Sequence, residues 1–126
     1  MKRTNILYWT FTTLTALITA LTGIMYFTSP AMAAGFGHLG FPDYFRHELG
    51  VAKLIAALVI VLPMAPLRLK EWAYAGLAIT FFSGFIAHTT VDGVATGMAA
   101  LIALVLLTLS YIYLHKRNGT SDLATA

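Results

Sequence analysis

The chain has 126 residues, of which 59% are hydrophobic and 10% are charged, and its mean hydropathy is +0.79. A soluble domain of this length could not bury so much apolar surface, so we expect a single domain, residues 1–126, that lipid partly solvates. The absence of cysteine excludes disulfides, thiolate metal sites and dithiol redox chemistry. The net charge of +3 is small and spread over segment ends, which favours a membrane protein over a nucleic-acid-binding one.

Four apolar segments follow one another along the chain, at about residues 6–27, 44–62, 72–91 and 94–114. Each is close to the roughly 20 residues that an α-helix needs to cross the hydrocarbon core of a bilayer. Turn-forming residues separate them, at Ser29-Pro30, between Pro63 and Pro66, and at Asp92-Gly93. The last break is so short that the final two segments should form an antiparallel hairpin. The sequence therefore predicts an all-α fold, an integral membrane bundle of four transmembrane helices.

The basic residues predict the orientation of these spans. With four crossings, six of the eight lysines and arginines fall on one side of the membrane: Lys2, Arg3, Arg68, Lys70, Lys116 and Arg117. Basic residues flank spans on the cytoplasmic side, so both termini should be cytoplasmic, with residues 115–126 as a flexible tail. An aromatic belt is expected on the same side, formed by Tyr8, Trp9, Trp72, Tyr74, Tyr111 and Tyr113.

A cleaved secretory signal is the alternative for the first span. Lys2-Arg3, an apolar run and Ala31-Met32-Ala33 resemble a signal with its cleavage site, and removal would leave three spans. The apolar run of about 22 residues is longer than the 7–15 of a signal core. Four retained spans are therefore the preferred interpretation.

Small residues recur at helical spacing in every span, which favours close helix packing in lipid. The predicted packing faces are Thr12, Ala16, Thr19, Ala20 and Gly23 in the first span; Leu49, Gly50, Lys53, Ala56, Ala57 and Ile60 in the second; Ala73, Gly76, Thr80, Gly84, Ala87 and His88 in the third; and Gly93, Gly97 and Ala100 in the fourth. The threonines can donate to carbonyls one turn back or bond across helices.

Lys53 is the most unusual residue, because it lies inside the second apolar segment, about nine residues beyond Tyr44 and roughly 13 Å deep. A lysine at the centre of a span costs about 2.5–3.5 kcal/mol on insertion scales. The polar side chains expected in the same outer half of the bundle are Tyr44, Arg46, His47, Glu48, Lys53, His88 and Asp92. They predict either a ligand pocket or a structural network in which Lys53 pairs with Glu48 or Asp92, and the sequence leaves both open.

The connection between the first two spans, residues 28–43, is long, apolar and rich in glycine. Long connections of this kind are often lids or interfacial segments. We expect it to be a loop across the outer mouth of the bundle, above the polar residues. A pocket beneath such a loop would suit an amphiphilic ligand with a polar head.

The stretches "LGFPDYFRHELGVAKLIAALVIVLP" and "RLKEWAYAGLAITFFSGFIAH", followed by Asp92-Gly93, resemble the DoxX-like family of small bacterial membrane proteins. The resemblance implies a four-helix bundle in the bacterial inner membrane, and marks Lys53, Glu71, Trp72, His88 and Asp92 as motif residues. Ala87 departs from the serine that often precedes the histidine in this family. The family name comes from similarity to a small subunit of a membrane thiosulfate:quinone oxidoreductase, and distant relatives look like cargo receptors or assembly factors.

Three functions are compatible with these residues. The preferred one is binding of a lipid-soluble small molecule, a quinone being the named candidate, in the outer-half pocket, as an accessory subunit of a membrane oxidoreductase. The alternative is a structural or assembly protein that docks a membrane-protein partner or a second copy. Independent catalysis or transport is weaker, because Ser83 has no base at a suitable spacing and charged residues do not continue across the cytoplasmic half. No HxxxH or ExxH spacing predicts a metal site, and His38 and His115 are given no role.

Overall fold

A computed structural model describes the backbone of residues 2–125 and the side chains of residues 2–119. The elements are α1 (Lys2–Thr28), α2 (Pro30–His38), α3 (Asp43–Val61), α4 (Leu67–Asp92), the 3₁₀ helix η1 (Val94–Gly97) and α5 (Met98–Thr125). No strand occurs between residues 2 and 125, which confirms the all-α prediction. Pro42 and Pro66 immediately precede α3 and α4. At this position the fixed φ of proline and its missing N–H are compatible with a helix.

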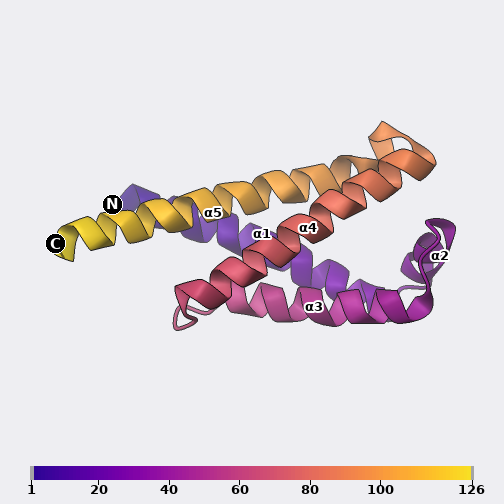
Figure 1. Cartoon of the computed structure of the whole chain (residues 1–126), viewed down its shortest axis with the longest axis horizontal. Helices are drawn as coiled ribbons and strands as arrows, with labels where there is room; N and C mark the ends of the chain where they lie inside the picture. Colours follow the sequence, from indigo (N-terminus) through magenta and orange to yellow (C-terminus); the bar gives the residue numbers. More distant parts are fainter. Residues whose placement is uncertain (1, 126) are drawn as a thin grey trace.

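The four long helices form a ring. α1 packs against α3 and α5, and α4 packs against the same two helices, so α1 and α4 lie opposite each other. Figure 1 shows both chain termini and the α3–α4 turn at one end of this bundle, and α2 and the α4–η1 turn at the other. We call these the terminal end and the far end. The Asp92-Gly93 break does produce the predicted α4–α5 hairpin, with Gly93 at φ 100°.

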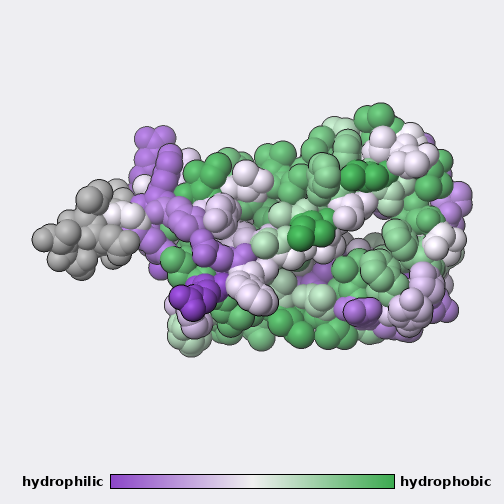
Figure 2. Space-filling view, in the orientation of Figure 1, coloured by the Kyte–Doolittle hydropathy of each residue, from purple (hydrophilic) through white to green (hydrophobic). Residues whose placement is uncertain are grey.

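Three segments within the described residues are long and apolar enough to cross a membrane: α1, α4, and Val94–Gly119, which comprises η1 and most of α5. The predicted second span, α3, has only 19 residues, and Arg46, Glu48 and Lys53 interrupt its apolar character. The face in Figure 2 is mostly apolar along its middle, with hydrophilic residues gathered toward its two ends. These features are those of a membrane protein, as the composition indicates.

The packing of α1 against α3 follows the predicted small-residue faces. Thr12 and Thr19 are fully buried on α1, and Gly50 and Ala57 are buried on α3. A Cβ on Gly50 would lie 2.7 Å from the Phe27 ring and 3.3 Å from the carbonyl oxygen of Gly23, so the two helices touch through their backbones. The Thr15 and Thr19 hydroxyls donate to the carbonyls of Phe11 and Thr15, one turn back, as expected.

The prediction of the packing face of α4 is wrong over the first half of this helix. The buried residues of this helix are Lys70, Tyr74, Leu77 and Phe81. Gly76 is exposed, and a Cβ there would meet nothing within 4 Å. The reason is that α4 fills the centre of the ring: its bulky Tyr74, Leu77 and Phe81 share one core cluster with small residues of the other helices, Ala16, Ala57 and Ala103. With small residues on the other helices, α4 does not need a small-residue face of its own.

Two segments differ from the predicted loop and tail. Residues 30–38 of the predicted loop 28–43 form α2, which Ser29 caps by accepting from the Met32 N–H. The buried Phe36 of α2 packs edge-on against the Tyr26 ring, with 4.8 Å between ring centroids. Residues 115–125, predicted as a flexible tail, continue α5 as helix, and the side chains from residue 120 onward lie outside the described part.

Candidate functional site

Lys53 lies in the interior of the bundle, with only 5% of the residue exposed. Its Nζ donates to the Thr22 hydroxyl at 2.6 Å and to the Tyr26 hydroxyl at 3.3 Å, both on α1. The ammonium also lies 4.6 Å from the centroid of the Tyr26 ring and 5.7 Å from that of Phe81 on α4. Among the described side chains no carboxylate forms an ion pair with it. Hydroxyls and aromatic faces therefore stabilise this cation in place of a counter-charge.

The predicted pairing of Lys53 with Glu48 or Asp92 is wrong. Glu48 is exposed on the outer side of α3. Asp92 ends α4 at the far end, where its Oδ1 lies 2.8 Å from Nε2 of His38 on α2. His38, for which the sequence predicts no role, therefore connects α2 to the end of α4. Lys53 is separated from both acids because it points to α1, and Thr22 and Tyr26 are its nearest acceptors.

Arg46 is the second buried cation of this region, 8% exposed. Its guanidinium donates to the backbone carbonyl of Tyr26, and Nη2 lies 3.6 Å from Asp43 Oδ1. Tyr26 thus accepts from Arg46 through its backbone and from Lys53 through its hydroxyl. The remaining candidates are not part of this cluster: Tyr44 is 72% exposed, His47 stacks on Phe27, and His88 is half-buried elsewhere on α4.

Lys53 also lines a groove between α3 and α4 with a volume of about 390 Å³. Its other walls are mostly apolar: Ala52, Ile55, Ala56, Val59, Leu69, Trp72, Ala73, Gly76, Leu77 and Thr80. Trp72 and Ile55 are exposed at its rim, so the groove opens on the outer surface of the bundle. From Lys53 it extends toward Leu69 and Trp72 at the terminal end, whereas the sequence placed the pocket in the opposite half.

A second buried polar cluster, at the terminal end, was not predicted. Lys70 Nζ donates to the Tyr8 hydroxyl at 3.2 Å, and the Ser110 hydroxyl lies 2.6 Å from those of Thr12 and Tyr74. Tyr8 and Tyr74 were predicted in the aromatic belt, but they are 0% and 3% exposed. Positions 70, 74, 77 and 81 recur with the helical period, but α4 is apolar on most of its circumference, so this spacing does not distinguish them from the other faces of the helix.

Ser110→Ala is expected to lower the free energy of unfolding by about 1–2 kcal/mol. The Ser110 hydroxyl lies within 2.6 Å of two buried hydroxyls, so its removal leaves Thr12 and Tyr74 without that partner. Equilibrium unfolding in detergent, followed by circular dichroism, measures the change. The matched control is Thr108→Ala on the same helix, whose exposed hydroxyl bonds only its own backbone. Equal stabilities of the two variants would contradict the role of this network.

The sequence model of the DoxX-like family matches residues 10–113. The matched range begins in α1 and ends in α5, so it contains Lys53, its partners Thr22 and Tyr26, and the groove. No curated protein and no solved structure matches the chain.

Proposed function

The chain belongs to the DoxX-like family, and we propose that it binds a lipid-soluble small molecule with a polar head in the α3–α4 groove, at Lys53. The observation that carries this proposal is a buried lysine, without a carboxylate partner among the described residues, that lines a mostly apolar groove. Ionisable residues inside a membrane domain are costly and are functional-site candidates for that reason. An apolar groove with few polar groups is also the usual form of a small-molecule site.

The hydrogen bonds of Lys53 leave capacity for a ligand. An ammonium carries three N–H donors, and Thr22 and Tyr26 accept two of them. In this proposal the third donor serves a ligand acceptor such as the carbonyl oxygen of a quinone, and the apolar part of the ligand lies along Ala56, Ala73 and Gly76. If the ligand is a quinone, the chain would serve as an accessory subunit beside a membrane oxidoreductase.

The proposal includes the topology predicted from the basic residues. Both termini lie at the same end of the bundle (Figure 1), as an even number of crossings requires. In this arrangement α3 crosses the membrane in the ring with α1, α4 and α5, and the terminal end faces the cytoplasm of a bacterial inner membrane.

A structural role is the competing function, and a specific observation favours it. Lys53 and Arg46 of α3 both bond to α1, so together they could serve only to fix these helices to each other. A bundle stabilised in this way would act as an assembly factor or docking partner for another membrane protein. A structural role predicts that Lys53→Met lowers the stability of the protein. Ligand binding predicts that the same variant loses a bound ligand.

We expect gently purified protein to retain about one small lipid-soluble molecule per chain, detected by mass spectrometry after extraction. Lys53→Met should remove it, because the polar contact is lost. Gly76→Phe should remove it as well, because the new ring would fill the groove from a position where a Cβ meets no other atom. The control is Lys2→Met, which removes an exposed lysine at the terminal end.

Two results would contradict ligand binding. One is an empty wild-type protein, with Lys53→Met affecting thermal stability alone; the structural role would then stand. The other is a retained molecule that all three variants keep equally, which would place it outside the groove.

A further inference from the structure

Two cations converge on one pair of aromatic rings at the terminal end. Lys70 Nζ of α4 lies 5.8 Å from the centroid of Tyr8 and 5.9 Å from that of Trp9. Arg117 Cζ of α5 lies 4.7 Å and 5.5 Å from the same two centroids. Tyr8 and Trp9 belong to α1, so three helices contribute to this site. Lys70 and Arg117 carry like charges beside the same two rings, and like charges repel each other unless an anion lies between or beside them.

The described side chains supply no such anion. Glu71 follows Lys70 in sequence but is engaged elsewhere, with its Oε1 3.0 Å from His115 Nε2 and 3.4 Å from the Tyr111 hydroxyl. Lys70 is 4% exposed and donates to the neutral Tyr8 hydroxyl. Nη1 of Arg117 is buried and has no hydrogen-bond partner within residues 2–119. Arg117 is only half-buried as a residue, so the site reaches the surface.

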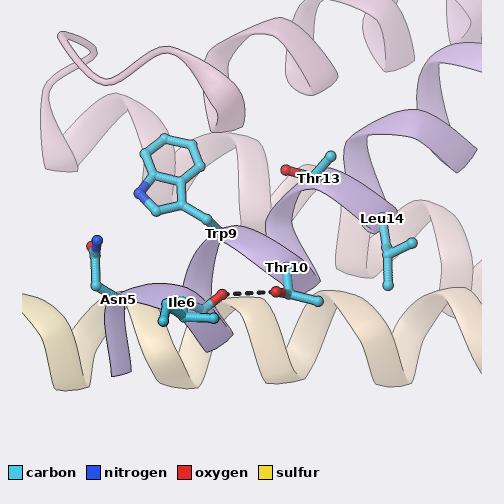
Figure 3. A pocket seen from close by; sticks show the side chains of 6 residues that line it. All are labelled: Asn5, Ile6, Trp9, Thr10, Thr13 and Leu14. Atoms are coloured by element: carbon cyan, nitrogen blue, oxygen red, sulfur yellow. Dashed lines mark hydrogen bonds between the residues drawn. The ribbon is translucent and has the colours of Figure 1, made fainter. Parts of the chain in front are cut away.

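A groove of about 530 Å³ begins at the same tryptophan. Figure 3 shows its lining on α1, formed by Asn5, Ile6, Trp9, Thr10, Thr13 and Leu14. The lining is mainly apolar, and the Thr10 hydroxyl donates to the carbonyl of Ile6, 2.8 Å away, so it is not directed at a ligand. Trp9 therefore lies between two cations that no described carboxylate neutralises and an open apolar surface of a membrane-spanning helix.

We propose that Lys70 and Arg117 bind a phosphate group, and that its source is the headgroup of an anionic phospholipid whose acyl chain lies along the α1 groove. Arg forms paired hydrogen bonds to phosphate oxygens and Lys contributes a compact charge. Basic pockets between helices at a membrane surface select anionic headgroups in the same way. Tyr8, Trp9 and Arg117 lie outside the range that matches the DoxX-like family, so the site does not depend on the function proposed at Lys53.

The test is native mass spectrometry of the full chain in nanodiscs that contain equal amounts of phosphatidylglycerol and phosphatidylcholine. Wild-type protein is expected to retain phosphatidylglycerol in preference to phosphatidylcholine. Arg117→Gln should weaken that retention about fivefold, because one basic residue near a membrane surface contributes about 1 kcal/mol. Arg117→Lys keeps the charge and should keep most of the selectivity. The matched control is Arg68→Gln, which removes an exposed charge two residues before Lys70.

Each remaining outcome argues against part of the proposal. Equal retention of the two lipids by wild-type protein would overturn it. Equal losses of phosphatidylglycerol in Arg117→Gln and Arg68→Gln would show that general surface charge, and not this site, retains the lipid. Displacement of phosphatidylglycerol by excess glycerol 3-phosphate would keep the phosphate site but exclude a lipid as its source.

Discussion

Replacing Thr22 with valine and Tyr26 with phenylalanine together is expected to lower the free energy of unfolding by about 3 kcal/mol. The two changes keep the volume of the side chains, and the phenyl ring still faces the ammonium, but both hydroxyl acceptors of Lys53 are lost. A hydrogen bond to a charged group contributes about 1.5–3 kcal/mol, and a buried charge without partners is strongly unfavourable. Equilibrium unfolding in mixed detergent and SDS micelles gives the difference.

Adding Lys53→Met to this double variant is expected to restore most of the lost stability. Removing the buried cation removes the need for its acceptors, and an apolar replacement of a buried charged group is often neutral or stabilising. The matched control is Thr10→Val with Tyr44→Phe, the same chemical changes at exposed positions, which should stay within about 0.5 kcal/mol of wild type. A triple variant as unstable as the double variant would show that Thr22 and Tyr26 stabilise the fold independently of Lys53.

The helical architecture could be predicted because it depends on local signals. Length and hydropathy predicted the long helices, Asp92-Gly93 predicted the hairpin, and the spacing of Gly50, Lys53 and Ala57 placed Lys53 inside the bundle. The inner face of α4 could not be predicted in the same way. This helix is apolar on most of its circumference, so hydrophobic periodicity does not distinguish its buried side from its lipid-facing side.

The partners of Lys53 depend on how α1 is rotated about its axis relative to α3. A single sequence does not reveal this rotation. The sequence predicts a carboxylate partner, Glu48 or Asp92, and contains no signal for Tyr26 as a partner. The structure turns Tyr26 inward, where Phe36 of α2 covers it. The sequence predicts Lys70 as an exposed flanking charge on the cytoplasmic side, because it lies next to the end of an apolar span. Its burial follows from the tertiary position of Tyr8.

Gly97→Val is expected to lower the free energy of unfolding by about 3 kcal/mol, because the hairpin between α4 and α5 closes through this glycine. A Cβ at Gly97 would lie 2.6 Å from the Thr89 hydroxyl oxygen and 3.0 Å from both the Phe85 ring and the Phe85 carbonyl oxygen. The threonine could rotate away, but the carbonyl belongs to the backbone of α4, so the two segments would have to separate. Overpacking of this kind typically costs 1–3 kcal/mol.

Gly76→Val supplies the matched control on α4, since a Cβ there meets nothing within 4 Å and the position is exposed. Valine and glycine are both poor helix formers, so this variant should unfold within about 0.5 kcal/mol of wild type. Thermal unfolding of both variants in the same detergent makes the comparison. If Gly97→Val matched Gly76→Val in stability, the contact between η1 and α4 would not fix the hairpin, and the Asp92-Gly93 turn alone would have to hold α5 against α4.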